Sequence, residues 1–312
     1  MTPSPSPAPS LDGRAVLTAV ACYTLWGLLP LLFMAMAAAG FDAPEIVAHR
    51  AVWSVFVAGT LVLVSGQGRQ VIRVLGSPRT FGWLALSAFM IAINWGLYVF
   101  ATTHHATLEA SLGYYINPLL NMAAGAVLFR ERIDRWSGAA IALAAVGVAI
   151  QTLALGHVHW ISLFLALSFC AYAVIRKRVD ADAQTGLFVE CLVLLPFGAA
   201  LLVWLQAHGA GVGFASGVGL AWALSSGVAT VVPLALFAWS ARRLPLSMVG
   251  FIQFLAPTLQ FACGVWAGEP FTPLRAVSFA FIWAGAGVFA FAAWRRARAA
   301  REAVRLARDG DL

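Results

Sequence analysis

Polar side chains recur inside apolar segments of this chain, where they could bind or move a small molecule. In the segment 108–121, LEASLGYYINPLLN, every fourth position carries a carboxylate, a glycine or a carboxamide: Glu109, Gly113, Asn117 and Asn121. A helix would place these residues in one stripe, and such polar groups are unfavourable in hydrocarbon. We expect the stripe to line a cavity. The other interpretation is close helix packing, for which Asn and Gly are common in membranes.

A second polar group lies in the apolar segments that precede this stripe. Glu45 is followed one turn later by His49 and Arg50, and Asn94 lies in the middle of the next segment. A lone arginine inside a membrane needs a partner, which we expect to be Glu109. In the alternative interpretation, the Arg50 side chain reaches back to the membrane surface.

The second half of the chain offers one acid inside an apolar segment and a neutral version of the stripe. Glu190 is expected either to exchange a proton or a substrate amine on the inner side, or to reach the surface. Gln253 and Gln260 mirror the stripe, and Pro118 and Pro257 are expected to break their helices. The expected substrate-binding or translocation residues are Glu45, His49, Arg50, Asn94, Trp95, Glu109, Tyr114, Asn117, Asn121, Glu190 and Gln253.

An intramembrane enzyme is the alternative function, with His104, His105 and Glu109 as a site at the outer surface. Adjacent histidines point to different sides of a helix, and the sequence has no H-E-x-x-H or G-x-S-x-G motif. It also has no G-x-x-x-x-G-K-[ST] loop for nucleotide hydrolysis, and its 4 cysteines show no C-x-x-C spacing. We therefore expect no catalytic residue, no metal and no cofactor.

The composition indicates that lipid surrounds most of the chain. Of its 312 residues, 61% are hydrophobic and 11% are charged, with a mean hydropathy of +0.84. A soluble domain usually has about 25% charged residues. The net charge of +7 lies in short clusters between apolar segments, without forming one basic face. This pattern argues against nucleic acid as a partner and for membrane lipid.

Ten apolar segments are long enough, or nearly so, to cross a bilayer. They lie at 15–39, 44–65, 81–102, 107–129, 136–155, 159–175, 186–206, 217–240, 245–267 and 273–294. The expected fold class is all-α and integral to the membrane, with ten transmembrane helices in two inverted five-helix repeats. The expected domains are a disordered tail (1–13), a first repeat (14–155), a second repeat (156–294) and a basic cytoplasmic tail (295–312).

The positions of the basic residues predict the orientation. If the amino terminus is cytoplasmic, all but two of the 20 Lys and Arg residues fall on the cytoplasmic side, the exceptions being Arg50 and Arg275. By the positive-inside rule, both termini are expected to be cytoplasmic. The arginine-rich tail is either a helix lying on an anionic leaflet or a solvated segment.

An internal repeat relates the segment around residue 118 to the segment around residue 257. The matched pairs are Pro118 with Pro257, Tyr115 with Phe254 and, after a one-residue gap, Glu131 with Glu269. The copies are five predicted spans apart, and because five is odd the second half should be inverted relative to the first. Inverted repeats with prolines at corresponding positions are typical of secondary transporters with a site near the bilayer midplane.

Several stretches also resemble a known family. They are EIVAHRAVWS (45–54), NWGLYVFA (94–101), HHATLEASLGYYINPLLN (104–121), QTGLFVECLVLLP (184–196) and FIQFLAPTL (251–259). Together they are similar to the RarD-type permeases, the chloramphenicol-sensitivity proteins of the drug/metabolite transporter superfamily with EamA-type repeats. The resemblance covers the chain from about residue 11 to about residue 294. It implies a ten-helix bundle of two inverted halves in a bacterial inner membrane, and it leaves the substrate open.

The expected function is secondary-active transport of a small organic metabolite or drug-like compound by alternating access, as an exporter or permease. A gradient of protons or of a counter-substrate is the expected energy source, with Glu109 and Glu190 as the candidates for proton exchange. The chain could also form a homodimer, with Gly285 and Gly287 supporting close packing between protomers.

Overall fold

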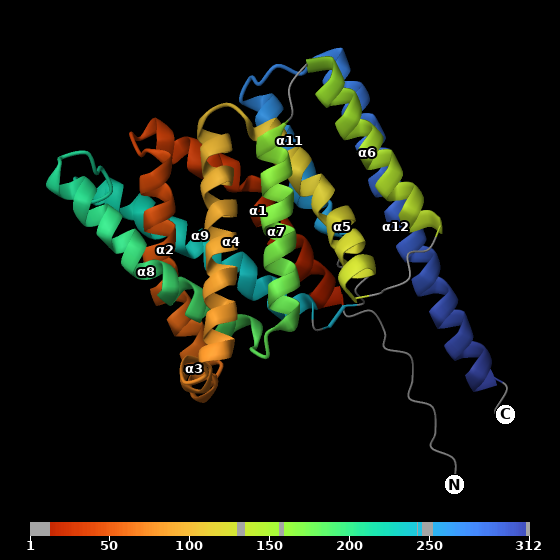
Figure 1. The fold of residues 1–312 in the computed structure, drawn as a ribbon, viewed down its shortest axis with the longest axis horizontal. Helices are drawn as coiled ribbons and strands as arrows, with labels where there is room; N and C mark the ends of the chain where they lie inside the picture. The colour runs from red at the N-terminus through yellow and green to blue at the C-terminus, as the bar shows by residue number, and fades with distance from the viewer. Residues whose placement is uncertain (1–12, 130–134, 156–158, 242, 245–251, 310–312) are drawn as a thin grey trace, which may run out of the picture.

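The structure, a computed structural model, describes residues 13–129, 135–155, 159–241, 243–244 and 252–309. These residues are almost entirely helical, and they include no strand (Figure 1). The helices are α1 (Gly13–Ala38), α2 (Ala43–Val64), α3 (Gly68–Leu75), α4 (Pro78–Thr103), α5 (Thr107–Phe129), α6 (Arg135–Leu155), α7 (Trp160–Arg178), α8 (Ala183–Ala207), α9 (Gly217–Ala241), α11 (Leu255–Trp266) and α12 (Pro273–Asp309). Residues 1–12 of the predicted tail and Glu131 lie outside the described residues.

The distribution of side chains is that of a protein in lipid. Seven of the described helices are long and apolar enough to cross a bilayer: α1, α2, α4, α7, α8, α9 and the part of α12 up to Ala292. Large apolar side chains such as Phe56 and Leu63 are exposed on them, whereas Glu45 and Asn94 are buried. Because this reverses the usual arrangement of soluble proteins, the chain is a multi-pass membrane protein.

Local signals define where the helices begin. Pro44 occupies the first turn of α2, and Pro78 begins α4 after the cap Ser77, whose Oγ lies 3.5 Å from the Thr80 nitrogen. Gly40 and Gly268 have φ of +96° and +82° in the connections before α2 and α12. These left-handed conformations favour glycine and let short connections reverse the chain.

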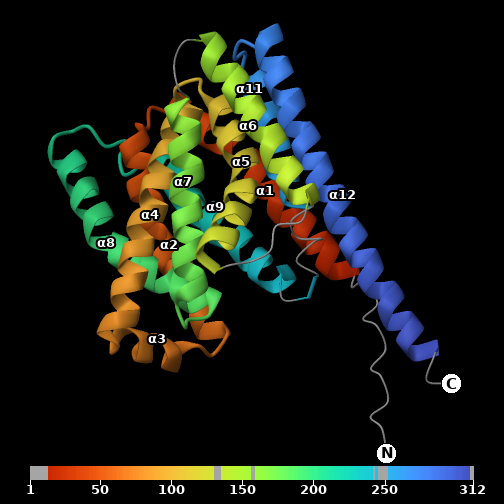
Figure 2. The same ribbon diagram turned by 45° about the vertical axis from the view of Figure 1, so that its right-hand side comes forward.

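The helices form one bundle with a flanking pair. α2 packs against α8 and α9, α4 against α7 and α8, α1 against α9 and α11, and α5 against α7 and α11. α6 and α12 run side by side at one edge in both views (Figures 1 and 2). α1 begins and α12 ends at the end of the bundle where α3 lies (Figure 1).

Three features differ from the sequence-based expectations. The short helix α3 lies in a connection where no helix was expected, and α12 continues from the last predicted span to Asp309 as one helix. α5 runs through Pro118 without interruption, so the break predicted there is absent. Pro257 lies in the first turn of α11, where proline is tolerated, just after a turn at Phe254.

Candidate functional site

Arg50 of α2 lies at a buried junction of four helices. Its side chain is only 4% exposed, and its Nε donates a 2.9 Å hydrogen bond to the Thr230 hydroxyl of α9. The guanidinium carbon lies 4.5 Å from the centroid of the Trp95 ring of α4 and 5.1 Å from that of Phe33 of α1. The cation therefore packs between aromatic rings inside the bundle, an arrangement that is favourable when water is excluded.

Asn94 and two tyrosines continue the wall beside Arg50. Tyr114 donates a 2.9 Å hydrogen bond to Asn94 Oδ1, and Asn94 Nδ2 donates to the Leu165 carbonyl and to Ser168 Oγ of α7. The rings of Tyr98 and Tyr114 meet edge to face with centroids 5.3 Å apart. Asn94 thus fixes the position of Tyr114 and links α4, α5 and α7.

The predicted ion pair between Arg50 and Glu109 is wrong. Glu109 Oε1 lies 3.1 Å from His159 Nδ1 at the start of α7, and the Glu109 side chain is 18% exposed. None of the ion pairs among the described residues includes Arg50. The alternative, in which Arg50 reaches the surface, also fails because the side chain is buried. Glu109 faces α7 because it belongs to the first turn of α5, next to the residue that caps α7.

Glu45 and His49 form a separate buried pair that anchors the connection between α8 and α9. Glu45 Oε1 accepts hydrogen bonds from the backbone nitrogens of Val212 (2.9 Å) and Gly213 (2.8 Å) and lies 3.6 Å from His49 Nε2. His49 Nδ1 accepts a 3.2 Å hydrogen bond from the Trp53 indole. The residues that were expected to form one cluster in the outer half therefore form two groups. Glu45 and His49 hold the connection between α8 and α9, whereas Arg50 and Asn94 belong to the buried wall described above.

Glu190 has its own set of partners. It is 1% exposed, so the interpretation as a surface-reaching carboxylate is wrong. Its carboxylate lies 3.7 Å from Arg176 Nε, and it accepts hydrogen bonds from Ser87 of α4 and, at 3.4 Å, from Tyr172 of α7. These contacts tie α4, α7 and α8 together.

The carboxamides of the predicted stripes are buried or half-buried. Asn117 is 1% exposed, and its Oδ1 and that of Asn121 accept no hydrogen bond from the described residues. Gln260 Nε2 donates to the Trp26 carbonyl at 3.3 Å, and Gln253 is half-buried just before the turn at Phe254. Carboxamide oxygens that are buried or half-buried and have no partner among the described residues are typical of groups that contact water or a ligand.

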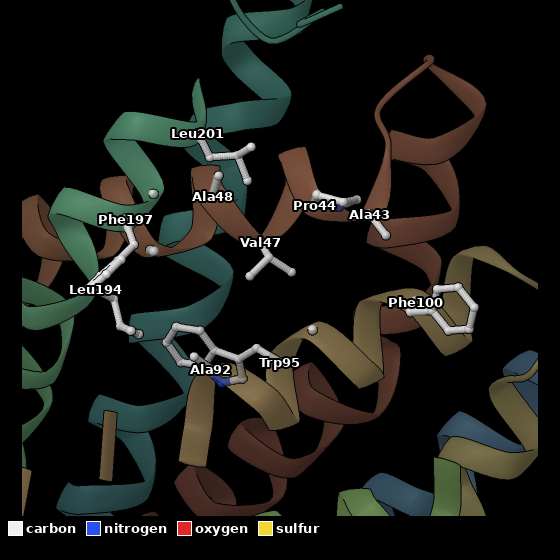
Figure 3. A pocket seen from close by; sticks show the side chains of 13 residues that line it. Ala43, Pro44, Val47, Ala48, Ala92, Trp95, Phe100, Leu194, Phe197 and Leu201 are labelled. Carbon is white, nitrogen blue, oxygen red and sulfur yellow. The ribbon is translucent and has the colours of Figure 1, made fainter. Parts of the chain in front are cut away.

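An apolar pocket opens between α2, α4 and α8 on the other side of Trp95. It encloses about 430 Å³, and Figure 3 shows Val47 and the Trp95 ring pointing into it. Small residues create the space: Ala48, Ala51, Ala92, Gly96 and Gly198. Because Trp95 also stacks on Arg50, its ring separates the apolar pocket from the buried cation.

No protein-family model matches the chain, but curated relatives do. The chain is 39% identical over 297 residues to an uncharacterized transporter of Vibrio cholerae, a match that covers 93% of this chain and 96% of the relative. It is 40% identical over 278 residues to the protein RarD of Salmonella typhimurium, covering 88% and 94% respectively. The chain belongs to the RarD-type permeases.

A solved structure supports the fold of this RarD-type chain. A protein known from a crystal structure superposes with a TM-score of 0.58 at 21% identity, covering 90% of this chain and 98% of that one. The similarity concerns the fold alone. Because the Vibrio cholerae relative is named as a transporter and is matched over 96% of its length, the chain is a membrane transporter.

Sequence reasoning missed several residues that hold this permease together. Glu269 accepts hydrogen bonds from the backbone nitrogens of Thr107 (2.5 Å) and Leu108 (2.9 Å), and so caps α5. Thr230 was not predicted as the partner of Arg50, because single hydroxyl groups are common in apolar segments. Arg176 was not predicted as the partner of Glu190, because it lies in a cluster of basic residues. The repeat match of Glu269 was the only signal for its role.

In the described part of the chain, no three His, Cys, Asp or Glu side chains are grouped so that they could hold a metal ion. His104 stacks on Phe100 and is exposed, and neither His104 nor His105 forms an ion pair with Glu109. The residues around Arg50 and Trp95 instead combine hydrogen-bond donors, aromatic faces and an apolar pocket, a combination that can bind an organic molecule.

Proposed function

We propose that this permease is a secondary-active transporter that moves a small organic compound across the bacterial inner membrane by alternating access, as an exporter or permease. The observation that carries the proposal is the buried wall around Arg50, where α1, α2, α4 and α9 meet. Buried ionisable groups inside membranes are unfavourable, and they often mark the pathway of a substrate or an ion.

The packing of the helices supports two inverted five-helix halves. Suppose that α1, α2, α4, α5 and α6 correspond to α7, α8, α9, α11 and α12. The main contacts between the halves then form matching pairs: α1 with α9 and α7 with α4, α2 with α9 and α8 with α4, α1 with α11 and α7 with α5. A substrate site at the interface of such halves becomes accessible to each side in turn when the halves rock.

Individual contacts support the same relation. Gly147 of α6 lies against Ser278 of α12, and Gly285 of α12 lies against Ala140 of α6. The two glycines are separated by the same number of residues as Ser278 and Ala140, as inverted copies require. Tyr115 and Phe254, which match in the repeat, stack on each other with centroids 6.3 Å apart. The proposal also includes a homodimer. Gly287 has open space around it and is the glycine proposed to contact a second protomer, because Gly285 already packs against Ala140 of the same chain.

The proposal includes cytoplasmic termini and coupling to a proton or counter-substrate gradient. Arg69 and Arg73 of α3 lie at the end of the bundle where α1 begins and α12 ends, consistent with the positive-inside rule (Figure 1). Glu190 and Glu109 are the carboxylates proposed to exchange protons, because each has a partner that could be released when the halves move.

The test is efflux from liposomes that contain the full-length protein and a defined mixture of organic acids, amines, amino acids and neutral drug-like compounds. Mass spectrometry should find at least one compound that leaves faster than from empty liposomes. The Asn117→Ala change should reduce this flux, and the His104→Ala, His105→Ala double change should not.

Two outcomes would count against the proposal. No protein-dependent flux of any compound would end it, and a loss of activity confined to the double histidine variant would favour the enzyme alternative. Flux that is equal with and without a pH gradient would remove proton coupling alone.

A further inference from the structure

Arg50 is a buried cation whose counter-charge is missing from the described residues. Four carboxylates in the described part of the chain are buried or half-buried, and each has partners elsewhere. Glu45 binds the backbone of Val212 and Gly213, and Glu269 binds that of Thr107 and Leu108. Glu109 and Glu190 pair with other side chains, as described above. None of these acids neutralises Arg50.

Hydrogen-bond donors around Arg50 are also unused. Arg50 Nη1, the Tyr98 hydroxyl and Ser54 Oγ are buried and have no hydrogen-bond partner among the described residues. Ser54 lies one turn after Arg50 on the same face of α2. Tyr98 packs edge to face on Phe33, the ring that also lies against the guanidinium. Buried donors in this number indicate a ligand that brings acceptors.

We propose that the transported compound is an organic carboxylate with an apolar body, and that its carboxylate binds Arg50. This inference rests on the proposed transport function. A carboxylate only accepts hydrogen bonds, and its two oxygens match the guanidinium fork. The single cation selects one negative charge over several.

The apolar body of this compound is assigned to the pocket between α2, α4 and α8. Trp95 borders both spaces, since its ring stacks on the guanidinium and lines the pocket (Figure 3). A volume of about 430 Å³ accommodates a phenyl or branched alkyl group with its linker. A rotation of the Trp95 side chain would join the two spaces.

The test uses three probes of similar shape and different charge: 3-phenylpropionate, 3-phenylpropionamide and 3-phenylpropylamine, with benzoate and 4-methylpentanoate as further acids. Each is added to the full-length protein in detergent at low chloride, and the melting temperature is measured. A ligand that binds the folded state raises this temperature. We expect the acids to raise it and the amide and amine of the same size to leave it unchanged.

Variants then assign the effect to Arg50. Arg50→Gln should weaken binding of the acids about 30-fold or more, because it removes one partner of a buried charge pair. Tyr98→Phe, which removes only a hydroxyl, should weaken it by a smaller factor and keeps the test valid if Arg50→Gln does not fold. The matched control is Arg243→Gln: Arg243 also lies over an indole, 4.1 Å from the Trp239 centroid, but it is exposed.

Three results would overturn the inference: stabilisation by the amide or amine equal to that by the acids, an acid effect that survives in Arg50→Gln and Tyr98→Phe, or no effect of any acid up to about 10 mM. Protein-dependent efflux of only neutral or cationic compounds would also overturn it and leave the transport function standing. Acid binding to Arg50 without flux of any compound would leave the carboxylate site standing and would overturn the transport function.

Discussion

Glu269 holds the start of α5, and its removal should destabilise the protein measurably. The buried carboxylate lies 2.5 Å from the Thr107 nitrogen and 2.9 Å from the Leu108 nitrogen. A hydrogen bond to a charged group contributes about 1.5–3 kcal/mol, so Glu269→Ala should lower the free energy of unfolding by about 3–6 kcal/mol. Glu269→Gln keeps one acceptor oxygen and should cost about half as much.

The free energy of unfolding can be measured by titrating SDS into detergent micelles that contain the full-length protein, followed by tryptophan fluorescence. Glu302→Ala is the control, because this exposed acid on α12 pairs with Arg298 at 3.2 Å. An exposed pair contributes about 0.2–1 kcal/mol. Equal losses for the Glu269→Ala and Glu302→Ala variants would refute the capping role, since two buried hydrogen bonds would then contribute no more than a surface contact.

Two further predictions concern the anchors of the other helices. Gly213→Ala should lower the free energy of unfolding by about 1–3 kcal/mol, because the added Cβ would overlap the buried His49 ring. Gly217→Ala, with open space around its Cβ, should change little, and equal losses would contradict the overlap. Arg176→Gln should cost about 3–5 kcal/mol by leaving Glu190 charged and buried, and adding Glu190→Gln should restore most of that loss. An additive double variant in the same SDS titration would show that the two side chains are not coupled.

The helices could be predicted closely from the sequence because length and hydropathy determine them. The predicted segment 44–65 corresponds to α2 (Ala43–Val64), and the segment 107–129 coincides with α5. α3 escaped prediction because a two-turn helix at the membrane surface needs no apolar run. Pro118 did not interrupt α5, since neighbouring helices in a membrane can stabilise a helix that contains proline.

A level along the helix could be predicted for Arg50, but its partners could not. A fixed rise per residue gives the level of a side chain along its helix, and this predicts Arg50 inside the membrane. The neighbour that it meets depends on how the helices rotate and pack, which the sequence pattern leaves open. Glu109, at a similar predicted level, therefore turned out to face His159 of α7, while Arg50 faces Thr230 of α9.

The acids show a second reason why site prediction stopped short. Glu45 and Glu269 bind backbone N–H groups of connections and helix starts, and such partners have no side-chain signature in a sequence. A carboxylate in an apolar segment is thus equally compatible with a substrate site and with an anchor. Only the arrangement in space separates the two roles, by showing which polar groups already have partners.

Arg50 and Glu190 are two buried charges that differ in whether the protein supplies a counter-ion. Each lies equally far from the first residue of its helix, in α2 and α8, and both are buried. Glu190 has Arg176 as its counter-ion, whereas Arg50 has one hydroxyl and two aromatic faces. Because a buried charge without a counter-charge is unfavourable, a bound anion would stabilise the protein at Arg50 and not at Glu190. Ligand binding and stability should therefore be coupled in the first proposed half, while the corresponding charge of the second is neutralised by the protein itself.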